Sequence, residues 1–261
     1  MPTANATIMA LMRVEPFGVG SVVHVVKRGA RGMEIVRDEA DRWRFARILY
    51  LLNDSHQTKH RREHQSSPSP ERHKSDLCLD SRLFIRPDHW PERDPLVAIL
   101  AWTLMPNHFH LLLQEIREGG ISKFMQRLCG SMSAAFNEKY DEKGSIFQGA
   151  YKSRTIDSDP YFHHIVPYIA VKNVFELYPG GLREALRDYD TAWQWAKEYP
   201  FTSFQTHAFK SASPIIDMAH LRSLGVTEGS TFKTASWDML MTHMNSKEIR
   251  EEHSNIFLED W

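Results

Sequence analysis

The hydrophobic and polar positions along the chain alternate between short β-branched runs and longer stretches with helical spacing. Residues 22–26 form a β-branched run that ends at Lys27-Arg28-Gly29, which is typical of a strand leading into a glycine turn. Apolar runs at 96–102 and 108–114 are separated by Met105-Pro106-Asn107, and this break predicts two adjacent strands joined by a tight turn.

Several stretches have the spacing of amphipathic helices. One helix is expected to open at Asp38, a second to cover residues 121–136, and a third to run from Asp159 to Asn173. Residues 146–156 predict a turn and a fourth strand. The order strand, helix, strand, strand, helix, strand, helix predicts an α+β fold in which helices cover one face of a mostly antiparallel sheet.

The pattern divides the chain into two parts. We expect one domain over residues 15–180 and a C-terminal helical extension over 181–261, with a last helix at 237–250. Residues 56–76 interrupt the first part with a polar segment that contains five Lys or Arg residues against two Glu residues. This composition predicts a flexible basic insertion.

Composition limits the class of protein and its compartment. Cys78 and Cys129 are too few for a disulfide framework, and a reducing cytoplasm is the expected location. No apolar run is long enough to span a membrane, and the first residues lack the features of a signal peptide. The formal net charge of −1 argues against nonspecific coating of nucleic acid, but charges are spread unevenly and are compatible with a local basic groove.

His108 and His110 are the first candidates for chemistry. Side chains two residues apart in a strand point to the same face, so both imidazoles can offer a nitrogen to one divalent cation. A His-x-His pair also occurs by chance, but this one lies on an otherwise apolar strand where polar groups are costly to bury. An unrelated metallohydrolase would need a carboxylate beside the pair, and Glu115 lies too far along the strand to serve easily.

Residues 104–113, Leu-Met-Pro-Asn-His-Phe-His-Leu-Leu-Leu, resemble the signature of IS200/IS605-type transposases and of the REP-associated tyrosine transposases. Weaker matches follow in the family's order at residues 24–29, 136–137, 144–149 and 159–173. The resemblance covers roughly residues 20–179, apart from the insertion. It implies a ferredoxin-like HUH domain, an antiparallel sheet covered by helices, with the C-terminal helical extension added to it.

The resemblance also implies a reaction. In this family the two histidines bind Mg²⁺ or Mn²⁺, and a helix tyrosine attacks a DNA phosphate to leave a 5′-phosphotyrosine and a free 3′-OH. A tyrosine hydroxyl with a pKa near 10 is a poor nucleophile at neutral pH, and the metal compensates as a Lewis acid. The family pattern implies Tyr168 as the nucleophile, with Tyr161 and Tyr151 as the alternatives.

The third metal ligand departs from the family pattern. The family usually has Asn or Gln four residues after the tyrosine, where this chain has Lys172, which cannot be a ligand while protonated. Asn173 follows at five residues, and on a regular helix it would point roughly 140° away from Tyr168. We take Asn173 as the third ligand if Pro167 distorts the helix or the helix ends nearby, and His164 as the alternative.

The resemblance implies single-stranded or hairpin DNA as the partner. Arg28, Lys152, Arg154 and Lys172 flank the expected site and are candidates to hold the DNA backbone, although exposed cations also serve solubility. The basic insertion is either a solvated loop or a further DNA contact. Relatives act as monomers or homodimers, and a domesticated protein that binds hairpins without cutting them is the alternative function.

Overall fold

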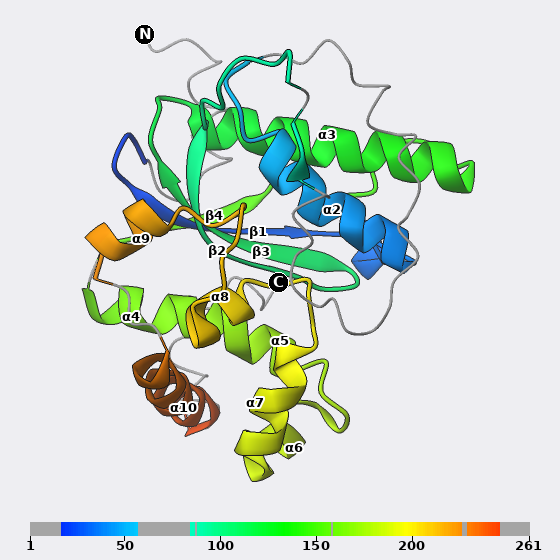
Figure 1. Cartoon of the computed structure of the whole chain (residues 1–261). Helices are drawn as coiled ribbons and strands as arrows, with labels where there is room; N and C mark the ends of the chain where they lie inside the picture. The colour runs from blue at the N-terminus through cyan, green and yellow to red at the C-terminus, as the bar shows by residue number, and fades with distance from the viewer. Residues whose placement is uncertain (1–16, 57–83, 87, 158, 226–228, 246–261) are drawn as a thin grey trace, which may run out of the picture.

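The computed structural model describes residues 17–56, 84–86, 88–157, 159–225 and 229–245 (Figure 1). Nearly all of the predicted basic insertion, residues 57–76, therefore lies outside the described residues. So do residues 246–250 of the last predicted helix, which is described as α10 (Ser230–Asn245).

Four strands form one antiparallel sheet in the order β2-β3-β1-β4. Helix α2 (Glu39–Leu51) connects the first two strands, and α3 (Gly120–Tyr140) connects the last two. This βαββαβ arrangement is the ferredoxin-like one, and the predicted α+β class is confirmed. The strands are β1 (Val22–Arg28), β2 (Val97–Leu104), β3 (His108–Glu115) and β4 (Lys152–Ile156), and a 3-10 turn, η1 (Ala30–Gly32), follows β1.

One face of the sheet packs against α2 and α3, which lie together above it in Figure 1. Asp38 caps α2, where its side chain accepts the backbone N–H of Asp41 in a capping box. Phe109 points from β3 into this layer and contacts Phe45 of α2, with 5.0 Å between ring centres.

Helices cover both faces of the sheet rather than the one face expected. The second face carries α4 (Asp159–Pro167), a π-helical turn η3 (Tyr168–Lys172) and α5 (Asn173–Phe175). The Thr103 hydroxyl of β2 donates to the backbone carbonyl of Ile169 at 2.6 Å, which fixes η3 against the sheet. Helices are needed on both faces because every residue of β2 is buried, and neither face of that strand can be left to solvent.

The C-terminal extension is helical, as predicted, and it also completes the sheet. Its chain pairs with the outer edge of β2, where Leu104 N–H donates to Phe201 at 2.9 Å and Ser203 N–H donates to Trp102 at 2.8 Å. This pairing covers an edge strand that would otherwise expose unpaired backbone groups. The remaining helices are α6 (Gly181–Arg187), α7 (Tyr189–Lys197), α8 (Phe204–Phe209) and α9 (Met218–Ser223).

Candidate active site

The two predicted metal histidines lie side by side on β3, on the face that packs against η3. Their ring centres are 5.0 Å apart, and both side chains are buried. The Nδ1 atom of His108 is 2.7 Å from the amide oxygen of Asn107. Because an amide oxygen only accepts, Nδ1 carries the proton and the lone pair of His108 is on Nε2. Asn107 thus sets the nitrogen that His108 can offer to a metal.

His24 is a third histidine of this site, which the sequence prediction missed as a functional residue. It is buried on the neighbouring strand β1, and its Nε2 lies 2.9 Å from Nδ1 of His110. The two rings are stacked with 5.2 Å between centres. When the Nδ1–H of His110 donates to His24, the lone pair of His110 is on its Nε2 atom. Each of the two histidines, His108 and His110, then has its Nε2 lone pair available to a metal. The available signal was a lone histidine in a β-branched strand, but the pairing register was needed to interpret it.

Tyr168 stands against these histidines. Its side chain is 5% exposed, and its ring lies edge-on to His110 and to His24 at 6.1 Å from each. On its other side, His243 of α10 lies 6.0 Å from the tyrosine ring. The structure therefore brings the predicted nucleophile and the predicted metal histidines together.

The helix is not regular at Tyr168, and this changes the geometry of Asn173. Pro167 has no N–H for the preceding turn, and a π-helical turn follows it directly. In a π-helix the backbone bonds join residues five apart, so Asn173 lies one turn above Tyr168 instead of being rotated away. The five-residue spacing therefore places Asn173 where the family's four-residue spacing would place it on an α-helix.

The side chain of Asn173, the predicted third ligand, is fully buried, and neither its amide oxygen nor its amide nitrogen has a hydrogen-bond partner in the described structure. A buried amide without partners costs roughly 1–3 kcal/mol. An amide oxygen is a suitable ligand for Mg²⁺ or Mn²⁺.

The alternative residues have other contacts. His164 is exposed on α4. The Tyr151 hydroxyl is 3.3 Å from the hydroxyl of Ser122 on α3, the helix on the opposite face of the sheet. Tyr161 lies under the guanidinium of Arg154, 5.1 Å from the ring centre.

Three predicted DNA-binding cations share the face of the histidines. In the pairing of β1 with β4, Lys152 is opposite Val26 and Arg154 is opposite His24, and partners in register point to the same side. The β1–β3 register likewise places Arg28 opposite His108. Partial burial lowers the pKa of Lys152, and the nearby Arg28 cation lowers it further.

Lys172, the fourth predicted DNA contact, is buried beside the tyrosine. Its ammonium pairs with Glu176 at 2.8 Å and lies 4.9 Å from the centre of the Tyr168 ring. In this structure Lys172 is therefore a buried neighbour of Tyr168 and not an exposed phosphate contact.

A metal at this site would depend on a neutral third ligand. Across the part of the chain that the structure describes, no group of three or more His, Cys, Asp or Glu side chains is placed to hold a metal ion. The predicted set of His108, His110 and Asn173 has the amide of Asn173 as its third member, and that amide is buried without a hydrogen-bond partner among the described residues.

Residues 92–172 match the family described as "Transposase IS200 like". Over this span the chain is similar to an IS200-like transposase. The resemblance inferred from residues 104–113 is thus confirmed. A solved structure described as a REP-associated tyrosine transposase bound to a REP hairpin is 14% identical with a TM-score of 0.39, covering 79% of this chain and 93% of that chain. No curated protein matches the chain.

The IS200-like segment contains β2, β3, α3, β4, α4 and η3, and so it includes Tyr168 and both predicted metal histidines. His24 and Arg28 precede the matched span, and Asn173 directly follows it. None of the described helices is both long and apolar enough to cross a bilayer.

Proposed function

We propose that the protein is a metal-dependent DNA strand transferase that cleaves and rejoins single-stranded or hairpin DNA through Tyr168. The observation that supports it most is the placement of Tyr168 edge-on to a buried histidine pair, within a segment similar to IS200-like transposases. His108, His110 and Asn173 would hold Mg²⁺ or Mn²⁺, which supplies Lewis-acid polarisation of the scissile phosphate when bound.

The residues of this chain account for the remaining steps. The Tyr168 oxygen attacks the phosphorus and gives up its proton to solvent, the bond from phosphorus to the 3′ oxygen breaks, and that oxygen takes up a proton. The products are a 5′-phosphotyrosine and a 3′-OH, and reversal of the same exchange rejoins DNA without ATP. The Lys172 ammonium, 4.9 Å from the centre of the Tyr168 ring, would stabilise negative charge that develops on the tyrosine, while Arg28, Lys152 and Arg154 would bind neighbouring phosphates.

Covalent capture of DNA tests this proposal. The full chain is incubated with Mn²⁺ and labelled hairpin oligonucleotides with randomised single-stranded flanks, and adducts are separated on a denaturing gel. We expect an adduct with the parent chain, none with Tyr168→Phe, and an adduct with the control Tyr161→Phe. An adduct that persists in Tyr168→Phe would contradict the assignment of the nucleophile.

The second candidate function is hairpin binding without cleavage. It is favoured by the burial of Tyr168 between the sheet and His243, and by Lys172 standing where the family usually has a ligand. This function predicts retention of hairpin DNA in a mobility-shift assay by the parent and by Tyr168→Phe alike, with no adduct from either.

A further inference from the structure

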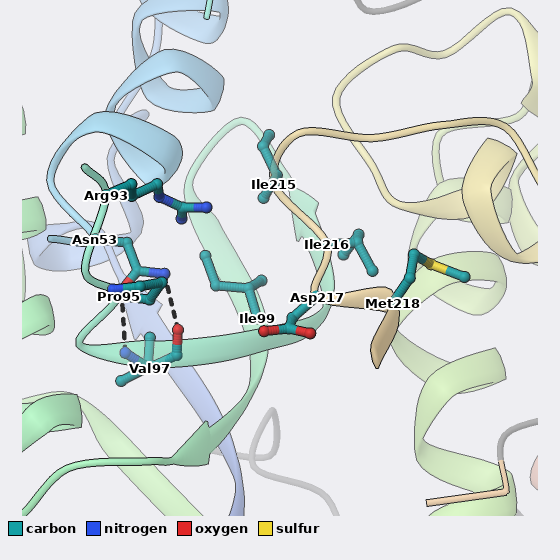
Figure 2. Close-up of a pocket in the computed structure, with 9 residues that line it drawn as sticks. All are labelled: Asn53, Arg93, Pro95, Val97, Ile99, Ile215, Ile216, Asp217 and Met218. Atoms are coloured by element: carbon teal, nitrogen blue, oxygen red, sulfur yellow. Dashed lines mark hydrogen bonds between the residues drawn. The ribbon is translucent and has the colours of Figure 1, made fainter. Parts of the chain in front are cut away.

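A cavity of about 230 Å³ lies at the outer edge of β2, away from the candidate active site. It opens between the end of α2, the residues before β2 and the segment that leads into α9 (Figure 2). Ile99 in its wall is roughly 13 Å along β2 from Thr103, the strand partner of His110. The volume is below the roughly 300–1,000 Å³ of drug-sized pockets and suits a single small ring system.

Two opposite charges face this cavity. Figure 2 shows the guanidinium of Arg93 and the carboxylate of Asp217 pointing toward the space around Ile99. Arg93 is half-buried and held over the ring of Tyr50 at 4.5 Å. A half-buried guanidinium that faces a cavity is suited to a ligand that accepts hydrogen bonds.

Asp217 is fixed but keeps acceptor capacity. It caps α9 by accepting the N–H of His220 at 3.1 Å, and its other oxygen is 2.9 Å from the His220 ring. These contacts use two of about four acceptor positions of a carboxylate. The third polar side chain in the wall, Asn53, has no acceptor position to spare. Its amide oxygen already accepts the backbone N–H groups of Leu96 and Val97, and its amide nitrogen donates to the carbonyl of Val97.

The remaining wall is apolar and comes from both sides of the cavity, which suits the flat faces of a ring. These side chains are Pro95, Val97, Ile99, Ile215, Ile216 and Met218. A free anion is a poor occupant, because attraction to Arg93 is offset by repulsion from Asp217. A neutral ring is a better one if one edge accepts hydrogen bonds and another donates them.

We propose that this cavity binds an unstacked guanine base of the DNA, an inference that rests on the proposed function. Guanine O6 and N7 accept hydrogen bonds and form the bidentate contact that arginine makes most often with a base. Its N1–H and 2-amino group donate and match the acceptors of Asp217. Adenine presents an amino donor in place of O6 and lacks the 2-amino group, so the same walls discriminate against it.

Mononucleotide binding to the full chain tests the guanine site without cleavage chemistry. GMP, IMP and AMP are titrated calorimetrically into the Tyr168→Phe protein. AMP controls for binding through the phosphate, and IMP lacks only the 2-amino group. We expect GMP to bind roughly tenfold or more tightly than AMP, with IMP between them.

Variants locate the site. Asp217→Asn retains a cap for α9 but replaces an acceptor with a donor, so it should remove the preference for GMP over IMP. Arg93→Met should weaken GMP binding roughly tenfold or more. Arg222→Met, which removes an exposed cation of α9 outside the cavity, should bind GMP as the parent does. Circular dichroism confirms that each variant is folded.

Three results would overturn the guanine site: no GMP binding, equal binding of GMP and AMP, or parental binding by both cavity variants. The outcome is separable from that of the proposed function. GMP binding through Arg93 and Asp217 without any DNA adduct would refute strand transfer alone, whereas adduct formation without guanine preference would refute the guanine site alone.

Discussion

At the scale of single residues, the contact of His24 Nε2 with His110 Nδ1 at 2.9 Å would leave Nε2 of His110 for the proposed metal. Replacing His24 with Leu removes the acceptor of the His110 Nδ1 proton, and loss of such a supporting partner typically lowers metal affinity 10- to 100-fold. His24→Gln retains an acceptor and should recover most of the affinity. Electron paramagnetic resonance measures the Mn²⁺ affinity of each variant in a titration of the DNA-free protein. His243→Leu is the control, because it removes a histidine that contacts the Tyr168 ring. Equal affinity in the Leu and Gln variants would rule out the role.

Substitution of Asn173 should lower the affinity for Mn²⁺ without lowering the free energy of unfolding. Because its buried amide has no partner among the described residues, Asn173→Leu should raise the free energy of unfolding by about 1–3 kcal/mol, or leave it unchanged, while lowering Mn²⁺ affinity. The matched control is Asn53→Leu, an equally buried residue whose amide makes three hydrogen bonds. Asn53→Leu should lower the free energy of unfolding measured by urea denaturation. Destabilisation of Asn173→Leu to the same degree would contradict the ligand assignment.

At the scale of elements, the π-helical turn allows Tyr168 and Asn173, five residues apart, to share one helix face as residues four apart do on an α-helix. Deleting Ala170 should convert η3 to a regular α-helical turn in which the two residues are four apart and remain on one face. We expect a folded protein with parental Mn²⁺ affinity. Deletion of Gly130 from the regular helix α3 is the control, since it rotates Met132 and Phe136 by about 100° out of the core and should prevent folding. Loss of metal binding in the Ala170 deletion would disprove this account of the turn.

The predictability of these elements depended on how local their causes are. The strand pair around Met105-Pro106-Asn107 and the shared face of His108 and His110 follow from turn residues and strand alternation, so the sequence sufficed. The contact between His24 and His110 joins residues 86 positions apart and depends on pairing of β1 with β3, which no local pattern specifies. The π-turn depends on packing of η3 against the sheet, and Pro167 alone only indicated a distortion.

At the scale of the whole molecule, His207 couples stability to pH. It is fully buried between α8 and α10 beside Phe232, and burial lowers its pKa from 6.5 to about 4, with the Leu100 backbone acting in the opposite direction. Unfolding therefore takes up a proton below pH 6.5. The stability associated with the neutral ring is complete above pH 6.5 and is lost as pH falls toward 4.

A pKa shift of this size corresponds to about 3 kcal/mol. Urea denaturation at several pH values should show the free energy of unfolding of the parent falling between pH 6.5 and 4. His207→Leu should show a shallower slope over the same range, and the exposed His163→Gln should follow the parent. The same slope in His207→Leu and the parent would assign the acid sensitivity to other groups.

The pairing of residues 201–203 with β2 has a consequence for synthesis on the ribosome. Thr103 and its partner Thr202 are 99 residues apart in the sequence. At a translation rate of about 5–20 residues per second, the outer edge of β2 waits roughly 5–20 s for its partner to be made. During that interval the nascent chain exposes the unpaired backbone groups at the edge of an apolar strand. Slow translation, or many ribosomes on one messenger RNA, should therefore favour aggregation of this protein before residues 201–203 pair with β2.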